Sequence, residues 1–452
     1  MGGRRLVYEC TNCGATSTGW LGRCPVCGQW DTLRRQSASA SPQPTPSSSP
    51  IPLEQAASSR EERIPTGIEE LDRVLGGGLV RGMSVVVGGE PGVGKSTLML
   101  QAAGALARAG VEVVYVAAEE SPRQVGMRAA RLGAGDKGVQ LLATTSVEEI
   151  CRHMERYQVA VVDSIQAVSV EGVGGVAGSI SQVRAAASRL VEQAKAAGVG
   201  LVLVGHVTKE GVLAGPRVLE HMVDTVIYFE PEAGSGLRVL RAVKNRFGAT
   251  DEVGLFTMGE RGLSPVADAS GLLLAHRPAG ATGSVVCAAM SGSRPLLVEV
   301  QALVSPSPMA TPRRQALGLD VGRVHMVLAV LGVHAGLALG GAEVFVNVTG
   351  GIRLVEPAAD LAVAVAVASS ALGRPAPGEL VCFGEVGLAG ELRAVGQVQK
   401  RLGEAARHGL RLGLTAPGSY EPPRGMRLIQ ASTLAGALRA LWPDAFPKLQ
   451  SG

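Results

Sequence analysis

Apolar runs alternate with helix-like segments through the middle of the chain. Six runs have the length and composition of buried β-strands: 84–88, 112–118, 159–163, 200–205, 223–229 and 237–243. The segment 97–109, between the first two runs, is rich in Ala and Leu and reads as a helix. Strands that alternate with helices are typical of a parallel sheet covered by helices. The pattern therefore predicts an α/β domain over residues 61–270.

The pattern changes on both sides of this domain. After it, strand-like segments at 283–290 and 295–303 precede an apolar helix at 322–333, which predicts an α+β domain over residues 271–452. Before it, residues 36–60 are rich in Ser, Ala and Pro and lack the apolar periodicity of a core, so we expect a linker. Residues 1–35 then form a separate small module.

Composition fits packed α/β domains, with 46% hydrophobic residues in a chain of 452. The formal net charge of +4 permits an acidic partner such as nucleic acid but does not establish one. Two arginines near the start lead into cysteines rather than an apolar signal segment, and no apolar run has the length and flanks of a membrane span. We therefore expect a cytoplasmic protein with no membrane partner.

Four cysteines in the first module have the spacing of a metal site. Cys10 and Cys13 form one CxxC pair, Cys24 and Cys27 form the second, and a glycine follows each pair. Four thiolates saturate a tetrahedral Zn²⁺ and leave no position for water, so we expect one structural zinc ion. A disulfide or redox pair is the less favoured alternative.

A complete phosphate loop lies between the first strand and the first helix of the α/β domain. Its motif G-x-x-x-x-G-K-S, with the residue that follows it, comprises Gly89, Glu90, Pro91, Gly92, Val93, Gly94, Lys95, Ser96 and Thr97. Backbone N–H groups of such a loop surround phosphates, the lysine bridges the terminal phosphates, and the serine hydroxyl contacts Mg²⁺. We therefore expect the domain to bind ATP and Mg²⁺.

Two carboxylates at strand ends are candidates for the hydrolytic chemistry. Asp163 ends an apolar strand downstream of the loop and suits the Mg²⁺ ligand sphere beside Ser96. Glu119 follows the strand at 112–118 and is the candidate acceptor of a proton from the attacking water. Its neighbour Glu120 is the rival, and a solvated acidic loop is the third reading.

Several further motifs resemble one family. The segments 66–72 (TGIEELD), 76–79 (GGGL), 119–121 (EES), 163–164 (DS) and 244–248 (KNRFG) accompany the phosphate loop. Together they resemble the bacterial DNA repair protein RadA family, also called Sms, over nearly the whole chain. The resemblance implies a four-cysteine zinc finger, a RecA-type ATPase core and a Lon-protease-like domain.

The resemblance also implies a function and further site residues. It implies a hexameric, RecA-type DNA helicase that drives branch migration on single-stranded and branched DNA together with a strand-exchange recombinase. Lys244 and Arg246 are then expected to reach the ATP site of a neighbouring subunit, and His206 is expected to sense the γ-phosphate. The Gly-rich segment 170–179 and the segment 207–220, with Lys209 and Arg217, resemble the DNA-binding loops of RecA-type proteins. Neither segment contains an aromatic residue, so we expect mainly electrostatic DNA binding there.

The C-terminal domain lacks the residues of a Lon-type Ser–Lys peptidase. The resemblance places Ala359 at the nucleophile position and Gln399 at the base position, with Lys400 displaced by one residue. We therefore expect no peptidase activity and assign the domain to ring assembly or a second DNA surface. The basic candidates for that surface are Arg313, Arg314, Arg393, Lys400 and Arg401.

Other readings remain open from sequence. One is a DNA-binding ATPase that acts as a recombination mediator without translocation, and another is a RecA-like strand-exchange filament. A clock-type kinase with duplicated ATPase domains is disfavoured by the single phosphate loop, and an ATP-dependent protease is disfavoured by Ala359.

Overall fold

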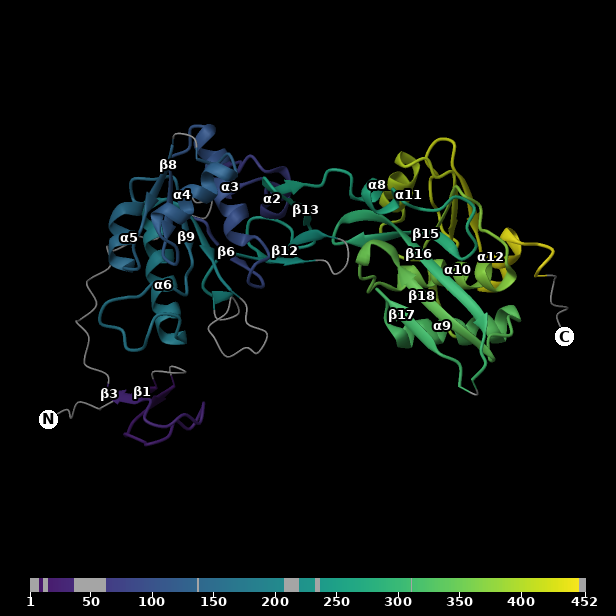
Figure 1. The fold of residues 1–452 in the computed structure, drawn as a ribbon, viewed down its shortest axis with the longest axis horizontal. Helices are drawn as coiled ribbons and strands as arrows, with labels where there is room; N and C mark the ends of the chain where they lie inside the picture. Colours follow the sequence, from purple (N-terminus) through teal and green to yellow (C-terminus); the bar gives the residue numbers. More distant parts are fainter. Residues whose placement is uncertain are drawn as a thin grey trace, which may run out of the picture. The chain divides into compact units, whose positions relative to one another are not determined.

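The chain forms two compact units. The computed structural model describes residues 8–10, 15–35, 62–135, 138–206, 219–231, 236–309 and 311–446 (Figure 1). Unit 1 contains residues 1–230 and 238–265, and unit 2 contains residues 231–237 and 266–452. The expected linker at 36–60 lies outside the described residues.

The N-terminal module is a small three-stranded antiparallel sheet. Its strands are β1 (Tyr8–Cys10), β2 (Thr16–Ser17) and β3 (Leu33–Arg35), in the order β2-β1-β3. The buried residues of its small cluster are Cys10, Cys24 and Leu33. So few apolar contacts cannot hold a fold of this size without further stabilisation.

A nine-stranded sheet forms the centre of unit 1. Its strands are β6 (Ser84–Gly88), β7 (Val113–Ala117), β8 (Val139–Leu142), β9 (Val159–Asp163), β10 (Gly200–Val204), β11 (Thr225–Pro231), β12 (Leu237–Asn245), β13 (Val253–Gly259) and β14 (Gly262–Pro265). The order is β14-β13-β12-β11-β6-β10-β9-β7-β8, and the six strands from β11 to β8 run parallel. The predicted parallel sheet is confirmed.

Helices cover both faces of this sheet, as Figure 1 shows. They are α2 (Glu69–Leu75), α3 (Lys95–Arg108), α4 (Pro122–Arg131), α5 (Val147–Met154) and α6 (Ile180–Ala197). Side chains of α2, α3 and α4 pack on the face that contains Val85 and Val87, whereas those of α5 and α6 pack with Val86 on the other. Both faces are apolar, which explains why the strands read as continuous apolar runs.

Three strands of this sheet, β8, β13 and β14, were not predicted. β8 has only four residues, and its two central side chains, Gln140 and Leu141, are exposed. A partly exposed edge strand carries neither a long apolar run nor a clear alternation, so its pattern resembles that of a loop.

Unit 2 is built on a seven-stranded mixed sheet. Its strands are β15 (Ser284–Ser291), β16 (Arg294–Pro306), β17 (Arg314–Leu317), β18 (Ala342–Val348), β19 (Leu380–Cys382), β22 (Leu412–Thr415) and β23 (Arg427–Gln430). The order is β17-β18-β16-β15-β19-β22-β23, with antiparallel pairs at the centre and parallel pairs on both sides.

Five helices accompany this sheet: α8 (Ala269–Leu274), α9 (Val321–Ala335), α10 (Asp360–Leu372), α11 (Val398–Arg407) and α12 (Leu434–Leu441). The expected strands at 283–290 and 295–303 and the expected helix at 322–333 correspond to β15, β16 and α9. Only α9 of these five helices was predicted, and α10, whose first ten residues are all buried, is among those that were missed. None of the helices in the described ranges is both long and apolar enough to cross a membrane.

Candidate nucleotide-binding site

The carboxyl ends of four adjacent parallel strands bring the candidate residues to one edge of the sheet. In the strand register Ala117 pairs with Asp163, Asp163 pairs with Val204, and Val204 pairs with Val87. Glu119, Asp163, His206 and the phosphate loop each lie at or just beyond one of these positions. Ligands of open α/β sheets bind at this edge, so the topology places the predicted residues in one site.

The phosphate loop joins β6 to α3, and α3 begins at Lys95. Gly94 precedes the helix with a φ of 112°, a left-handed conformation that favours glycine. Gly89 admits no side chain, because a Cβ there would collide with the carbonyl oxygen of Phe229. The loop thus exposes backbone N–H groups at a helix N-terminus, the arrangement that binds phosphate.

Lys95 is buried within its own loop. Its Nζ donates to the carbonyl oxygens of Gly89 and Glu90, at 2.8 and 2.9 Å. Burial lowers the pKa of Lys95 to about 8, although the nearby charges of Asp163 and Glu119 act in the opposite direction. The ammonium therefore lies among carboxylates and backbone carbonyls at a position where an anionic ligand would stabilise its charge.

Asp163 is held at the end of β9. The hydroxyl of Tyr115 donates to its Oδ2 at 2.5 Å, and Asp163 is 9% exposed. Burial, followed by the charge of Asp163 and the hydrogen bond to it, raises the pKa of Tyr115 well above its ordinary value. The phenol thus remains a donor and orients the carboxylate, so that Oδ1 could serve as a ligand of Mg²⁺.

The two neighbouring glutamates have different partners. Glu119 accepts a hydrogen bond from Ser164 and lies 3.5 Å from Nε2 of His206, whereas Glu120 pairs with Arg128 on α4. The hydrogen bond from His206 is the largest effect on Glu119, and its pKa is lowered even though burial opposes the shift. The geometry favours Glu119 as the carboxylate that faces the phosphate loop, and it gives Glu120 a role in anchoring α4.

The predicted phosphate sensor lies beside Glu119. Nδ1 of His206 is buried and has no hydrogen-bond partner among the described residues, and the same holds for Oε1 of Gln166, whose Nε2 donates to the carbonyl oxygen of His206. Buried polar atoms without a protein partner are uncommon, and a bound water, ion or ligand is one explanation of such atoms. Gln166 carries no recognisable motif, so the sequence analysis did not find it.

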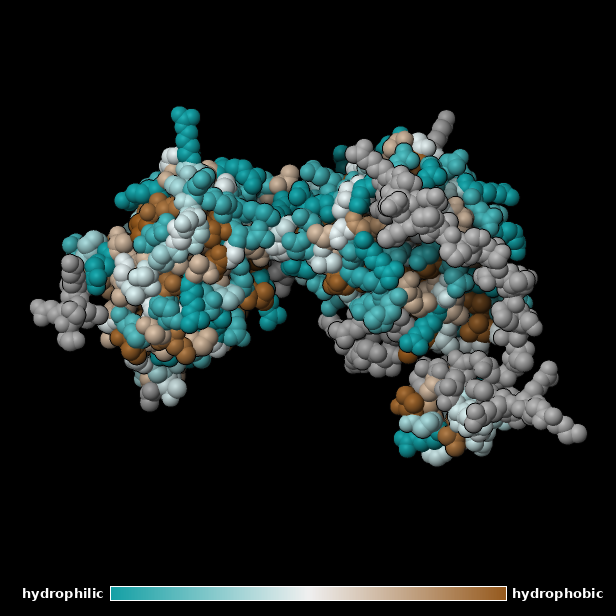
Figure 2. All heavy atoms as spheres, turned by 180° about the vertical axis from the view of Figure 1, so that it is seen from behind, coloured by the Kyte–Doolittle hydropathy of each residue, from teal (hydrophilic) through white to brown (hydrophobic). Residues whose placement is uncertain are grey.

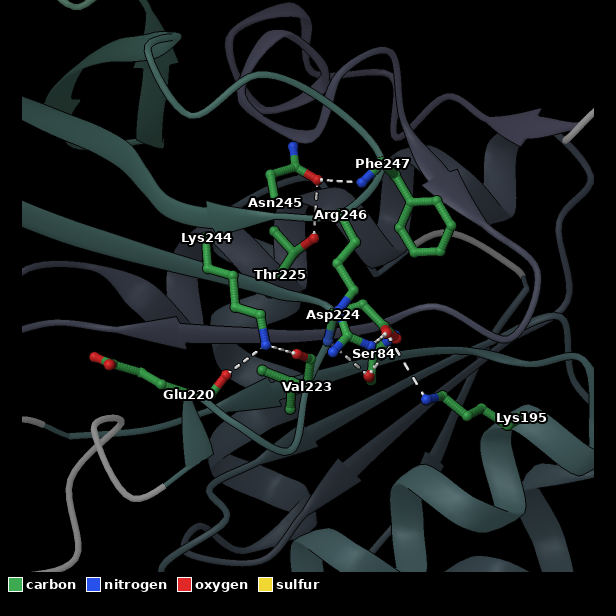
Figure 3. A network of polar contacts seen from close by, with 10 residues as sticks. All are labelled: Ser84, Lys195, Glu220, Val223, Asp224, Thr225, Lys244, Asn245, Arg246 and Phe247. Carbon is green, nitrogen blue, oxygen red and sulfur yellow. Dashed lines mark hydrogen bonds and ion pairs between the residues drawn. The ribbon is translucent and has the colours of Figure 1, made fainter.

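The KNRFG segment lies at the end of β12 and is tied to unit 1 by polar contacts (Figure 3). Nζ of Lys244 donates to the carbonyl oxygens of Glu220 and Val223, both at 2.7 Å. Burial and the charge of Arg246 lower the pKa of Lys244. Arg246 contacts Oδ1 of Asp224 at 3.2 Å, and 57% of its side chain is exposed.

Asp224 is the buried centre of that network. It accepts hydrogen bonds from both the N–H and the hydroxyl of Ser84, and Lys195 lies 3.7 Å away. Burial would raise its pKa, but the bonds from Ser84 and the charges of Lys195 and Arg246 together lower it. Like Gln166, Asp224 belongs to no recognisable sequence motif. Its contact with Arg246 becomes visible only in the structure.

The zinc module brings three of its four cysteines together. The sulfur atoms of Cys10, Cys24 and Cys27 all lie within 4.8 Å of one another, and Sγ of Cys10 lies 3.7 Å from Sγ of Cys27. Two thiolates on a tetrahedral Zn²⁺ with bonds of about 2.3 Å are separated by about this distance. The donor set therefore fits Zn²⁺. Cys13 lies outside the described residues.

The two predicted DNA loops differ in what the structure describes. Lys209 and Arg217 lie outside the described residues. In the segment 170–179, Gln182 of α6 bonds the backbone N–H and carbonyl of Val170 and the carbonyl of Val173. This segment has no basic residue, so any contact with DNA would come from its backbone.

The prediction that Arg401 belongs to an exposed basic surface of unit 2 is wrong. This residue is 2% exposed, and its guanidinium forms two hydrogen bonds with Glu356, because burial of a guanidinium requires a charged partner. Arg313 and Arg393 pair with Glu343 and Glu391. Arg314 donates to the carbonyl of Leu339, and Lys400 donates to that of Ser293.

The positions assigned to a peptidase dyad hold unreactive groups. Ala359 is buried at the end of the 3₁₀ turn η2 (Pro357–Ala359). The side-chain amide of Gln399 faces the backbone N–H and carbonyl of Glu421, and with its oxygen and nitrogen exchanged it would bond both, at 2.8 and 3.0 Å.

Two family models match the regions of the chain that contain the phosphate loop and the paired cysteines. A family model described as KaiC, an ATPase, matches residues 64–140, and one described as a rubredoxin metal binding domain matches residues 8–35. The DNA repair protein RadA of Pseudomonas aeruginosa is 47% identical over 97% of this chain and 99% of its own length. The chain belongs to the RadA family.

The RadA proteins of other bacteria support the same family membership. The RadA proteins of Bacillus subtilis and Escherichia coli are 43% and 44% identical, over 96% of this chain in each case and over 97% and 98% of their own lengths. RadA membership, the ATPase match and the phosphate loop show that unit 1 is an ATPase. The N-terminal module is a zinc ribbon.

Proposed function

We propose that this RadA family member is a DNA-dependent ATPase and helicase that acts in DNA repair by homologous recombination. It drives branch migration of intermediates formed by a strand-exchange recombinase. The observation that carries the proposal is the position of Glu119, which Ser164 and His206 hold close enough to the phosphate loop to affect the pKa of Lys95. This arrangement suits hydrolysis rather than nucleotide storage.

Each residue of the site has a separate task. Lys95 and the N–H groups of residues 89–97 bind the phosphates of ATP, while Ser96 and Asp163 hold Mg²⁺, which neutralises charge on the phosphates. Glu119 has a lowered pKa and is therefore ionised at neutral pH, as an acceptor of the proton from water must be. His206 connects Glu119 to the segment 207–220 that follows it, so the state of the nucleotide can reach a DNA-binding loop.

The DNA contacts are assigned to the segments 170–179 and 207–220. Lys209 and Arg217 supply cations to the phosphate backbone of single-stranded or branched DNA, and the segment 170–179 supplies backbone N–H groups. Contacts of this kind bind DNA without sequence preference and weaken with salt.

Lys244 and Arg246 complete the ATP site of a neighbouring subunit in a homo-oligomer, which we propose is a hexameric ring. The exposed guanidinium of Arg246 and its anchoring by Asp224 support this role, because a cation that acts across an interface must be both accessible and oriented. Residues 271–452 form a Lon-like domain that has no peptidase activity and contributes to ring assembly. The change of compact unit at Val266 supports a boundary near residue 270, and residues 1–35 and 36–60 form the ribbon and its linker.

Subunit mixing tests the ATPase assignment and the role of Arg246 together. Lys95→Ala subunits alone should not hydrolyse ATP with or without DNA, and Arg246→Ala subunits should bind nucleotide but turn it over about 10³-fold more slowly. Mixed rings contain some interfaces with an intact loop and an intact arginine, so DNA-stimulated hydrolysis should partly recover. Absence of recovery in mixtures shown to co-assemble would return Arg246 to a local structural role.

A further inference from the structure

The zinc ribbon exposes aromatic side chains that its fold does not use. Trp20 is 58% exposed and Trp30 is 71% exposed, and Leu21 and Val26 are exposed beside them. In Figure 2 the brown spheres at the surface of this module mark aliphatic side chains, because tryptophan lies near the middle of the Kyte–Doolittle scale and is not drawn in brown. The chain has three tryptophans, and the third, Trp442, is buried in unit 2. Two exposed tryptophans in a module this small call for a ligand, because burial normally stabilises such large rings.

Both indole rings lie against one bare stretch of backbone at Gly22. A Cβ on Gly22 would lie 3.7 Å from Cζ3 of Trp30 and 3.8 Å from Cη2 of Trp20. The backbone holds this arrangement, since Arg23 and Trp30 form an antiparallel bridge and Asp31 N–H donates to the carbonyl of Gly22 at 2.8 Å. The two rings therefore flank a strip of backbone that has no side chain.

Positive charge accompanies the rings. The guanidinium of Arg23 lies over Trp30, 5.9 Å from the ring centroid, and its Nε donates to the carbonyl of Gly28 at 2.7 Å. Residues 1–35 contain five arginines against two acidic residues. An aromatic surface with fixed cations and net positive charge fits an anionic ligand that has flat faces.

We propose that Trp20 and Trp30 form a stacking platform for unpaired bases of single-stranded DNA, with Arg23 and Arg34 contacting the phosphates. Stacking on aromatic rings next to cations is how proteins hold single strands without sequence preference. The ATPase segments at 170–179 and 207–220 contain no aromatic residue, so the ribbon supplies an interaction that those loops lack. The proposal rests on the proposed function to the extent that both require DNA as a ligand.

Tryptophan fluorescence tests the platform in the full-length chain. In a Trp442→Phe variant all tryptophan emission comes from Trp20 and Trp30, so titration with an oligo(dT) strand should quench most of it. Trp20→Ala and Trp30→Ala should each weaken oligo(dT) binding about 5- to 150-fold in fluorescence anisotropy, the range that loss of one stacked base produces. Binding to blunt duplex DNA, whose bases are already stacked, should change little.

Three controls keep the test decisive. Val26→Ala removes an exposed apolar side chain of the same module and should leave oligo(dT) affinity unchanged. Trp20→Phe and Trp30→Phe keep a ring and should restore much of the affinity. Zinc content equal to that of the unsubstituted chain shows that each variant retains a folded ribbon.

Three results would overturn the platform. Oligo(dT) binding without quenching and with unchanged affinity in both Trp→Ala variants would assign this face to a protein partner, while the proposed DNA-dependent ATPase would stand. An equal loss in Val26→Ala would show general apolar contact instead of stacking. Failure of the unsubstituted chain to bind any DNA would overturn the proposed function together with the platform.

Discussion

At the scale of single residues, local partners separate groups that look equivalent in sequence. Glu119 and Glu120 are adjacent and identical, but Glu119 contacts Ser164 and His206 whereas Glu120 pairs with Arg128. Only the contacts of Glu119 place a carboxylate beside the phosphate loop. The role of each glutamate therefore follows from the side chains around it.

This difference predicts opposite outcomes for two matched substitutions. Glu119→Gln should retain ATP binding and lose about 10²- to 10⁴-fold in turnover, because an amide cannot accept the proton of the attacking water. Glu120→Gln should keep turnover close to that of the unsubstituted protein, since it loses only an ion pair with α4. Steady-state ATPase rates and nucleotide affinities measure both. Equal losses in the two variants would contradict the assignment of Glu119 as the base.

The lowered pKa of Lys95 predicts a pH-dependent affinity. Its pKa of about 8 lies below its ordinary value of 10.5, so the free protein loses this proton above pH 8. Bound phosphates favour the ammonium, and binding at pH 8 to 9 should therefore take up a proton and weaken by as much as tenfold per pH unit. Calorimetry of a non-hydrolysable ATP analogue in buffers of different ionisation enthalpy measures that uptake.

The same shift has a stability consequence with a defined sign. Between pH 8 and 10.5 the unfolded chain holds the Lys95 proton and the folded chain does not, so the cost of burying Lys95 decreases as pH rises through this window. The control for the calorimetric test is a Lys95→Arg variant. Its guanidinium stays charged throughout this pH range, so nucleotide binding should take up no proton. Absence of uptake in the unsubstituted protein would show that Lys95 is not the group that meets the phosphates.

At the scale of elements, the sequence was most informative where a motif or a long apolar run was present. The phosphate loop, the Asp163 strand and the β10 strand could be placed because both faces of the sheet are covered and the strands are continuously apolar. Among the elements that were missed, β8 is a short exposed edge strand and α10 is a helix buried on all sides, and neither has a distinctive period. Tyr115, Gln166 and Asp224, and the contact of Ser164 with Glu119, were missed because they arise from strands that become adjacent only in the folded sheet.

The zinc ribbon is the element whose fold depends on a ligand. Cys24→Ser should release about one zinc ion per chain and unfold the ribbon, because the few apolar contacts around Cys10 and Leu33 cannot hold it alone. Zinc measured by atomic absorption, with proteolysis of the first residues, checks this outcome. Cys151→Ser, in the ATPase core, should leave zinc content unchanged.

DNA-independent ATP hydrolysis should survive the loss of zinc, since the ribbon contributes no residue to the nucleotide site described above. Full zinc retention in Cys24→Ser would count against a thiolate site that includes this residue.

At the scale of the whole molecule, the chain combines a zinc ribbon, an ATPase and unit 2, and we propose that unit 2 is a Lon-like domain and that the three parts form one DNA motor. The sequence supported this organisation through its family resemblance more than through its physics, since neither periodicity nor charge shows why unit 2 is needed. The structure corrects one part of that expectation, because Arg401 is buried in a pair with Glu356 and is therefore not part of an exposed basic surface.

The most direct test of the central claim is extension of joint molecules after the recombinase has been removed. Joint molecules are formed by a strand-exchange recombinase, deproteinised and then incubated with this protein and ATP, and heteroduplex length is measured with time. We predict ATP-dependent extension by the unsubstituted chain and none by Lys95→Ala. Stimulation seen only while the recombinase is present, with no extension of deproteinised joint molecules, would contradict the motor and favour a recombination mediator that does not translocate.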